Sequence, residues 1–261
     1  MKYGLGVLPT ESFVIIVPLF NESTRWNSKY WDEFKKPNLT LIFIDDGSTD
    51  NTWKIISDYA PKYSYRLDRN IGKAQALQAG FDIALNLDLC PNYIGFLDAD
   101  RAFDPGELND LISDSVDIFR DGFDSIWAAR VNLLGRNINR KRLRHLIGRV
   151  INSFLSISYK GFPYDSQCGF KMYKVDNCFR KSLEMKIRTR WFFEVEHLAN
   201  YSIKNNKKMR IWEQPLECWH DTAGSKLYRV RSLLIVIEIM RIFYFLKSAN
   251  KMVTQEREIS N

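Results

Sequence analysis

Three apolar runs in the first hundred residues end in acidic or amide side chains, and this pattern restricts the chain to few folds. The runs are Phe13–Leu19, Leu39–Ile44 and Tyr93–Leu97. Continuous runs rich in β-branched residues are typical of strands buried on both faces. They alternate with helical patterns and a fourth apolar run, at 50–59, 72–87, 105–119 and 125–129. This alternation predicts an α/β sandwich: a mainly parallel, Rossmann-like sheet flanked by helices.

The second half of the chain is less regular. A basic helical pattern spans 140–158 and a strongly apolar one, interrupted by charges, spans 230–246. A further helix and two strands are expected, at 190–201, 168–173 and 209–219. No linker rich in Gly, Pro or Ser divides the chain, so we expect a single domain over residues 1–250, with amphipathic helices toward its C-terminus. Residues 251–261 read as a polar tail that frays.

The polar residues that follow the first three strands predict a ligand site. They are Asn21 and Glu22, then Asp45 and Asp46, then Asp98 and Asp100. Ligands bind at the carboxyl ends of parallel strands, and a rim of carboxylates repels itself unless a cation or a donor-rich ligand lies there. Asp98 and Asp100 suit Mg²⁺ or Mn²⁺ shared with substrate phosphates. The alternative is an ordinary strand followed by a helix with Asp104 as N-cap and Pro105 in its first turn.

The charge distribution indicates an anionic partner. The formal net charge is +7, and residues 136–160 contain seven Lys and Arg residues with no Asp or Glu. Such a segment suits a membrane surface, a phosphorylated substrate or nucleic acid, or it is a plain solvated helix. The chain contains no nucleic-acid-binding signature, and an acidic rim repels a phosphate backbone, so we exclude nucleic acid.

Residues 140–158 have the basic and apolar faces of an interfacial helix, whereas 230–246 is shorter than a membrane span of about 20 residues. The apolar run Phe13–Phe20 is too short for a signal peptide. We therefore expect a cytoplasmic protein with reduced cysteines, attached peripherally to the inner face of the membrane. Alternatively, both helices pack on the sheet or form the interface of a homo-oligomer.

Seven segments resemble one enzyme family. VPLFNES, IDDGSTDNT, RNIGKAQALQAG and FLDAD occur in order within residues 12–105, and DSQCGFKMY, RWFFEVEHL and GSKL follow within 106–250. The first four are similar to the nucleotide-sugar-binding half of the family 2 inverting glycosyltransferases, which have the GT-A fold. The last three, in the acceptor-binding half, resemble the dolichyl-phosphate and polyprenyl-phosphate hexosyltransferases, most closely the β-glucosyltransferase type.

The resemblance implies roles for residues on the donor side. Those expected to contact the nucleotide sugar are Pro18, Asn21, Glu22, Asp46, Lys73, Asp98, Ser225 and Lys226. Among them, Asp46 would meet the base with Asp45 behind it, and Lys73 would approach the diphosphate. Asp98 would face the ribose and, with Asp100, provide the metal ligands. Ser225 and Lys226 belong to a loop expected to close over the diphosphate.

The resemblance also implies catalytic and acceptor residues. Asp100 would act through the metal, and Arg130 would approach the acceptor or donor phosphate. Gln167 and Lys171 would lie at the acceptor face. Glu194 would be the base for a hydroxyl acceptor or a positioning residue for a phosphate acceptor. Aromatic residues 191–193 are expected in the core.

Three positions depart from the family pattern or stay open. Ala102 replaces a glutamine that mannosyl-transferring relatives often carry, which favours the glucosyl type. Glu194 stands where that type usually has aspartate. His220 is either a metal ligand or a structural residue.

We therefore expect a metal-dependent inverting transferase that moves a hexose, glucose from UDP-glucose, onto a polyprenyl phosphate. The alternative acceptor is a saccharide hydroxyl in cell-envelope polysaccharide or glycan synthesis.

Overall fold

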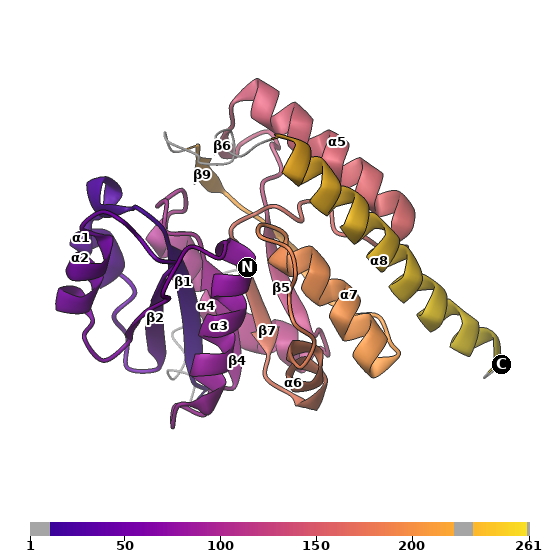
Figure 1. The fold of residues 1–261 in the computed structure, drawn as a ribbon, viewed down its shortest axis with the longest axis horizontal. Coiled ribbons are helices and arrows are strands. Elements are labelled where there is room, and N and C mark those ends of the chain that lie inside the picture. Colours follow the sequence, from indigo (N-terminus) through magenta and orange to yellow (C-terminus); the bar gives the residue numbers. More distant parts are fainter. Residues whose placement is uncertain (1–10, 222–231, 260–261) are drawn as a thin grey trace.

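One seven-stranded sheet runs through the part of the chain that the computed structural model describes, residues 11–221 and 232–259 (Figure 1). Its strand order is β3-β2-β1-β4-β7-β5-β8. The strands are β1 Phe13–Leu19, β2 Leu39–Asp45, β3 Ser64–Arg66, β4 Tyr93–Leu97, β5 Ser125–Ala129, β7 Phe170–Lys174 and β8 Ile211–Pro215. Only β7 among them runs antiparallel to its neighbours. Two short strands, β6 (Asn137–Asn139) and β9 (Cys218–His220), form a separate parallel pair.

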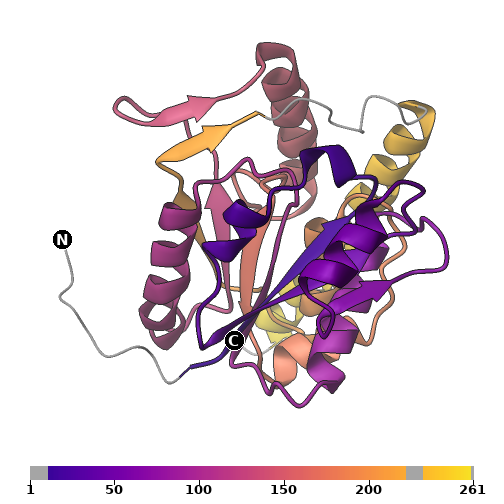
Figure 2. The same cartoon turned by 90° about the vertical axis from the view of Figure 1, so that its left-hand side faces the viewer.

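Helices cover both faces of the sheet (Figure 2). They are α1 Ser28–Asp32, α2 Thr52–Tyr59, α3 Lys73–Asn86, α4 Pro105–Arg120, α5 Arg142–Ser158, α6 Asn177–Leu183, α7 Phe193–Asn205 and α8 Ser232–Ile259. Successive side chains of a strand point to opposite faces. In β1, Val14 and Ile16 accordingly pack with α3 and α7 on one face, and Ile15 and Val17 pack with α1 and α4 on the other. The three-layer arrangement in one domain confirms the predicted fold class.

The two amphipathic helices of the second half lie side by side on one flank of the molecule (Figure 1). Their contact includes a stacked pair, Phe154 of α5 and Phe243 of α8, with ring centroids 4.5 Å apart. No described helix combines the length and apolar character needed to cross a membrane.

Three expectations about secondary structure are wrong. Residues 251–259 are not a separate tail, because α8 continues to Ile259 and buries Val253; the last two residues lie outside the described part of the chain. The expected strand 209–219 is two strands, since the chain leaves the large sheet after Pro215, a residue without an N–H for the ladder. The helix expected from residue 190 begins at Phe193, after Phe192, whose backbone angles of φ −110° and ψ 49° are not helical.

Candidate active site

A cavity of about 210 Å³ lies at the carboxyl ends of β1, β2 and β4. Eight of the residues singled out from the sequence for donor binding or catalysis line it: Pro18, Glu22, Asp46, Lys73, Asp98, Asp100, Arg130 and Glu194. Gln167 lines it as well. Asp46 and Asp100, which follow different strands, therefore face the same space, as the parallel arrangement of the strands requires.

Asp46 is held by the loop before α3. Its carboxylate accepts the backbone N–H groups of Ile71 at 2.8 Å and Gly72 at 2.9 Å, and the side-chain amide of Asn70 at 2.8 Å. Burial raises the pKa of Asp46, although the N–H groups of Ile71 and Gly72 oppose the rise. The acid is thus fixed in orientation before any ligand arrives. Gly47 permits this loop to approach, because a β-carbon there would lie 2.6 Å from the nitrogen of Asn70.

The two acids after β4 have different surroundings. Asp98 forms an ion pair with Lys73, the first residue of α3, at 2.6 Å. Asp100 accepts only a backbone N–H, that of Ala102 at 3.2 Å, among the contacts described for its carboxylate. Burial and the charge of Asp98 raise the pKa of Asp100. Burial lowers the pKa of Lys73, but Asp98 and Glu194 outweigh it and the net pKa is raised.

Glu194 lies in the first turn of α7 and is 2% exposed. Among the described residues, its Oε2 has no hydrogen-bond partner. Burial raises its pKa, and Lys171 and Lys73 counteract this in part. An unpartnered buried carboxylate oxygen is costly, and one that faces a cavity is suited to accept a proton or a hydrogen bond from a ligand.

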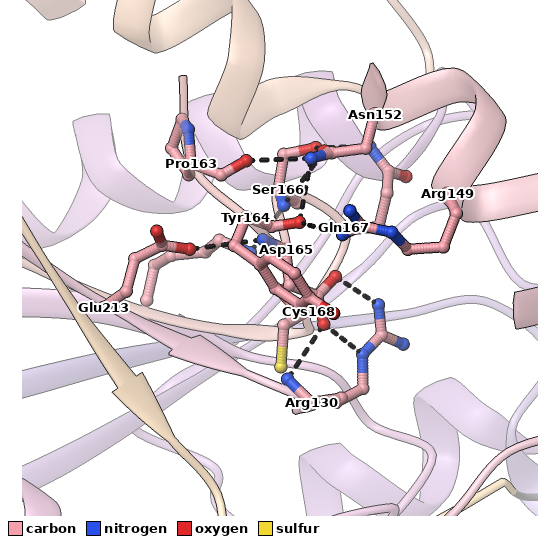
Figure 3. A network of polar contacts seen from close by, with 11 residues as sticks. Arg130, Arg149, Asn152, Pro163, Tyr164, Asp165, Ser166, Gln167, Cys168 and Glu213 are labelled. Atoms are coloured by element: carbon pink, nitrogen blue, oxygen red, sulfur yellow. Dashed lines mark hydrogen bonds and ion pairs between the residues drawn. The ribbon is translucent and has the colours of Figure 1, made fainter. Parts of the chain in front are cut away.

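Arg130 follows β5 and is fixed by an acid that the sequence interpretation did not assign. Asp165 accepts its Nε–H and one Nη2–H at 2.7 Å each and its backbone N–H at 3.0 Å (Figure 3). The guanidinium also stacks 5.0 Å from the ring centroid of Trp219. Although burial raises the pKa of Asp165, Arg130 holds it well below its usual range. The pair is therefore ionised and rigid at neutral pH.

The loop that contains Asp165 and Gln167 is held by side chains of α5 and β7; Figure 3 shows the contacts from α5. From α5, Asn152 donates to the carbonyls of Pro163 and Tyr164 at 2.8 Å each and accepts the hydroxyl of Ser166 at 2.6 Å. Lys171 of β7 supports the loop from below, with its ammonium donating to the carbonyls of Ser166, at 3.0 Å, and Cys168. The structure therefore places Lys171 beneath the loop that contains Asp165 and Gln167. Lys171 is fully buried there and does not line the cavity.

Other predicted residues lie elsewhere. Asn21 does not line the cavity; its side chain accepts the N–H of Thr49 at 2.8 Å and shapes the turn around Asp46. His220 ends β9 at an exposed position outside the cavity lining. Ser225 and Lys226 lie outside the described residues.

Several cavity residues escaped the sequence interpretation. Arg25 pairs with Glu22 at the rim, with 2.7 Å between Arg25 Nε and Glu22 Oε2. Phe192 and Phe193 are buried in the core as expected, with Trp191 packed against it, but Trp191 and Phe192 also line the cavity. Gly169 allows Asp98 to approach, and the motif around it, DSQCGF, was the available signal.

The acids after β4 fit a divalent cation of the kind that also binds substrate phosphates. Mg²⁺ is usually held by one or two carboxylates with phosphate and water oxygens completing the shell. Asp98 and Asp100 provide two, and burial, together with the charge of Asp98, raises the pKa of Asp100. Within the described ranges, no group of three or more His, Cys, Asp or Glu side chains could hold an ion by itself.

The sheet is mainly parallel and has helices on both faces. Its strand ends bring acids, a lysine and a buried arginine around one cavity. This combination defines a nucleotide-sugar-dependent transferase. The family model for glycosyl transferase family 2 matches residues 14–233. The chain therefore belongs to glycosyl transferase family 2, which confirms the predicted enzyme class.

Relatives and solved structures agree with this family. The chain is 27% identical to a dolichyl-phosphate beta-glucosyltransferase of Trichomonas vaginalis, over 88% of this chain and 72% of that one. It is 29% identical to a dolichyl-phosphate beta-glucosyltransferase of Dictyostelium discoideum, over 82% and 68%. Its fold is similar to glucosyl-3-phosphoglycerate synthase from Mycobacterium tuberculosis in complex with Mn²⁺ and UDP-glucose, with a TM-score of 0.61, 14% identity and coverage of 93% and 80%.

Proposed function

We propose that the enzyme transfers glucose from UDP-glucose to a polyprenyl phosphate with inversion. One observation carries this proposal: Asp46, Lys73, Asp98 and Asp100 share a cavity with Arg130, so a nucleotide diphosphate and an anionic acceptor can meet there. The relatives named as dolichyl-phosphate glucosyltransferases support the acceptor and the sugar.

On the donor side, Asp46 receives the imide N–H of the uracil and Asp98 lies toward the ribose. Pro18 and Glu22 border the nucleoside, and Asn21 supports the turn behind Asp46. Asp100 and Asp98 would hold a Mg²⁺ or Mn²⁺ ion, which would neutralise charge at the diphosphate. Lys73 adds a positive charge there.

On the acceptor side, Arg130 belongs to a cluster of cationic groups. Burial and the charge of Arg130 lower the pKa of Arg140, and burial, Arg140 and Arg149 lower the pKa of His145. Such mutual repulsion favours an anionic ligand beside Arg130. The second pKa of a phosphate monoester is about 6, so a lipid phosphate is largely deprotonated near pH 7. Its oxygen forms the bond to the anomeric carbon while the bond to UDP breaks, and UDP leaves with the electron pair. No general base is needed for this acceptor; Gln167, Lys171 and Glu194 then keep the acceptor site in shape.

Exposed apolar side chains beside the basic cluster support peripheral attachment to the inner face of a membrane. On α5, Leu146, Val150 and Ile157 share one face and are 60%, 63% and 78% exposed. On α8, Ile237, Met240 and Tyr244 are also exposed. Apolar side chains combined with Lys and Arg are typical of helices that lie in the headgroup region. The lipid of the acceptor would then reach the cavity from this flank.

A saccharide hydroxyl in glycan or envelope polysaccharide synthesis is the second candidate acceptor. Glu194 favours it, because a buried carboxylate with an unpartnered oxygen in the cavity is placed to remove the proton of a hydroxyl.

The decisive experiment incubates the protein with a panel of nucleotide sugars and either short-chain polyprenyl phosphates or oligosaccharides. Mg²⁺, Mn²⁺ and EDTA form parallel arms, and mass spectrometry identifies the product. A hexosyl polyprenyl phosphate formed from UDP-glucose, lost in EDTA, supports the proposal. A labelled saccharide with no lipid product supports the second candidate, and no product with any donor and metal overturns both.

A further inference from the structure

The segment before α7 is held by side chains from three different helices. The four N–H groups of residues 187–190 all donate to side chains, with donor–acceptor distances of 2.7 to 3.1 Å. The acceptors are Gln78 of α3, Glu196 of α7 and Glu238 of α8. Consecutive N–H groups in an irregular segment have no backbone ladder, so these side chains determine its position.

The last residue of this segment, Arg190, contacts the loop that holds Asp46. Its Nη2 donates to Oδ1 of Asn70 at 2.5 Å, and the amide of Asn70 donates to Asp46 at 2.8 Å. Its carbonyl accepts the N–H of Ala74, in the first turn of α3, at 2.9 Å. The approach is close, since a β-carbon on Gly72 would lie 2.8 Å from Cβ of Arg190. A displacement of Arg190 is therefore transmitted to Asn70 and Asp46.

The acceptor on α8 is unusual in its surroundings. Glu238 is half-buried in an otherwise apolar part of the helix, between Ile237 and Ile239, and accepts the N–H of Arg190 at 2.8 Å. Its second oxygen is buried without a hydrogen-bond partner among the described residues. Well-packed apolar replacements of buried charges are often neutral or stabilising, so stability alone does not account for a carboxylate here.

We propose that Glu238 is a positioning residue for the donor nucleotide, which it controls through Arg190, Asn70 and Asp46. The inference rests on the proposed function for the identity of the ligand, but the coupling itself exists without ligand. Helix α8 thereby sets the orientation of the acid that receives the base. Because α8 also presents exposed apolar residues, it connects the lipid-facing flank to the nucleotide pocket.

Two substitutions separate positioning from packing. Glu238→Gln keeps an acceptor oxygen for the N–H of Arg190, whereas Glu238→Leu removes it and fills the same space. We expect the Leu variant to raise the dissociation constant of UDP and the KM for the donor about tenfold, the cost of one lost hydrogen bond. Its kcat and acceptor KM should stay within about twofold of native, because the lost contact orients only the nucleotide. The Gln variant should resemble the native protein, and Glu184→Ala, which removes an exposed carboxylate paired with Lys204, is the matched control.

Amide hydrogen exchange gives a readout that needs no ligand. In Glu238→Leu, the amides of Ile71 and Gly72 should exchange about tenfold faster, since their acceptor Asp46 is less firmly held. Arg190→Lys keeps the backbone contact to Glu238 but loses the guanidinium hydrogen bond to Asn70. It should therefore accelerate exchange at residues 71–72 and not at 187–190.

The outcomes separate the two proposals. Unchanged exchange at 71–72 in Arg190→Lys, or unchanged exchange and UDP affinity in Glu238→Leu, would overturn the positioning role. If exchange responds as expected but the native protein binds no nucleoside diphosphate, the coupling holds and the proposed function fails.

Discussion

Gly169 and Asp98 touch so closely that no larger residue fits at position 169. A β-carbon there would lie 2.5 Å from Cγ of Asp98, a separation that real β-carbons essentially never show. The backbone fixes this approach, because the N–H of Asp98 donates to the carbonyl of Gly169 at 2.9 Å. The segment that leads into β7 and the end of β4, which carries Asp98, thus pack against each other at a single glycine.

Gly169→Ala should therefore displace the carboxylate of Asp98 and lower turnover by about 100-fold, since misplacement by about 1 Å costs that much. Donor turnover and thermal unfolding would be measured together. Gly148→Ala is the control, because a β-carbon there meets only Arg140 Nη2 at an ordinary 3.8 Å. Native turnover in Gly169→Ala would show that the position of Asp98 does not matter.

Glu194→Gln distinguishes the two acceptor classes. With a phosphate acceptor no proton has to be removed, and we expect a change in kcat of about tenfold or less. With a hydroxyl acceptor the base is lost, and kcat should fall by about 100-fold or more at constant donor affinity. Single-turnover rates and UDP affinity, measured with both acceptors, provide the comparison.

The Arg130–Asp165 pair should make the protein less stable as the pH falls into the acidic range. Because the pKa of Asp165 is lowered on folding, its contribution is complete above the unfolded pKa of about 3.9 and is lost as the pH falls below it. Asp165→Asn should cost about 3 kcal/mol of unfolding free energy at pH 7, because it leaves a buried arginine without its charge partner. The difference from native should shrink between about pH 5 and pH 2.

Urea unfolding at several pH values measures this difference, with Asp121→Asn, an exposed carboxylate after α4, as the control. A difference between native and Asp165→Asn that stays constant down to pH 3 would contradict the assignment of the pair.

Flotation with vesicles tests the exposed face of α5. The native protein should bind vesicles that contain anionic lipid at low salt, and binding should weaken as salt screens the basic residues. Replacing Leu146, Val150 and Ile157 together by serine should reduce binding by about tenfold or more, because apolar area is no longer buried in the lipid. Neutral vesicles are the control for the electrostatic part. Absence of native binding to anionic vesicles at low salt would remove the membrane hypothesis.

Local sequence patterns predicted the elements whose burial is periodic or continuous. β4 and β5 have the predicted bounds, Tyr93–Leu97 and Ser125–Ala129, because a short uninterrupted apolar run is typical of a strand covered on both sides. The donor-side acids follow from the same logic, since parallel strands bring their carboxyl ends together.

Features that depend on contacts between distant segments could not be predicted. The three-residue strands β3 and β6 have the sequences SYR and NIN, which carry no pattern of their own. No sequence pattern near Asp165 predicts its pairing with Arg130, which is 35 residues away in the sequence. The N–H groups of residues 187–190 likewise donate to side chains of α3, α7 and α8, and no local pattern predicts these contacts.

The position of β7 has a consequence for how the polypeptide can assemble. β7 lies between β4 and β5 although it follows both in sequence. Nothing therefore joins β5 and β8 to β4 in the sheet until residues 170–174 have been made. A nascent or truncated chain that stops before them presents an open, apolar β4 edge, and such edges template aggregation. We therefore expect a fragment that ends before residue 170 to be poorly soluble when it is produced alone. On the ribosome, the chain should need chaperone protection until β7 pairs with β4.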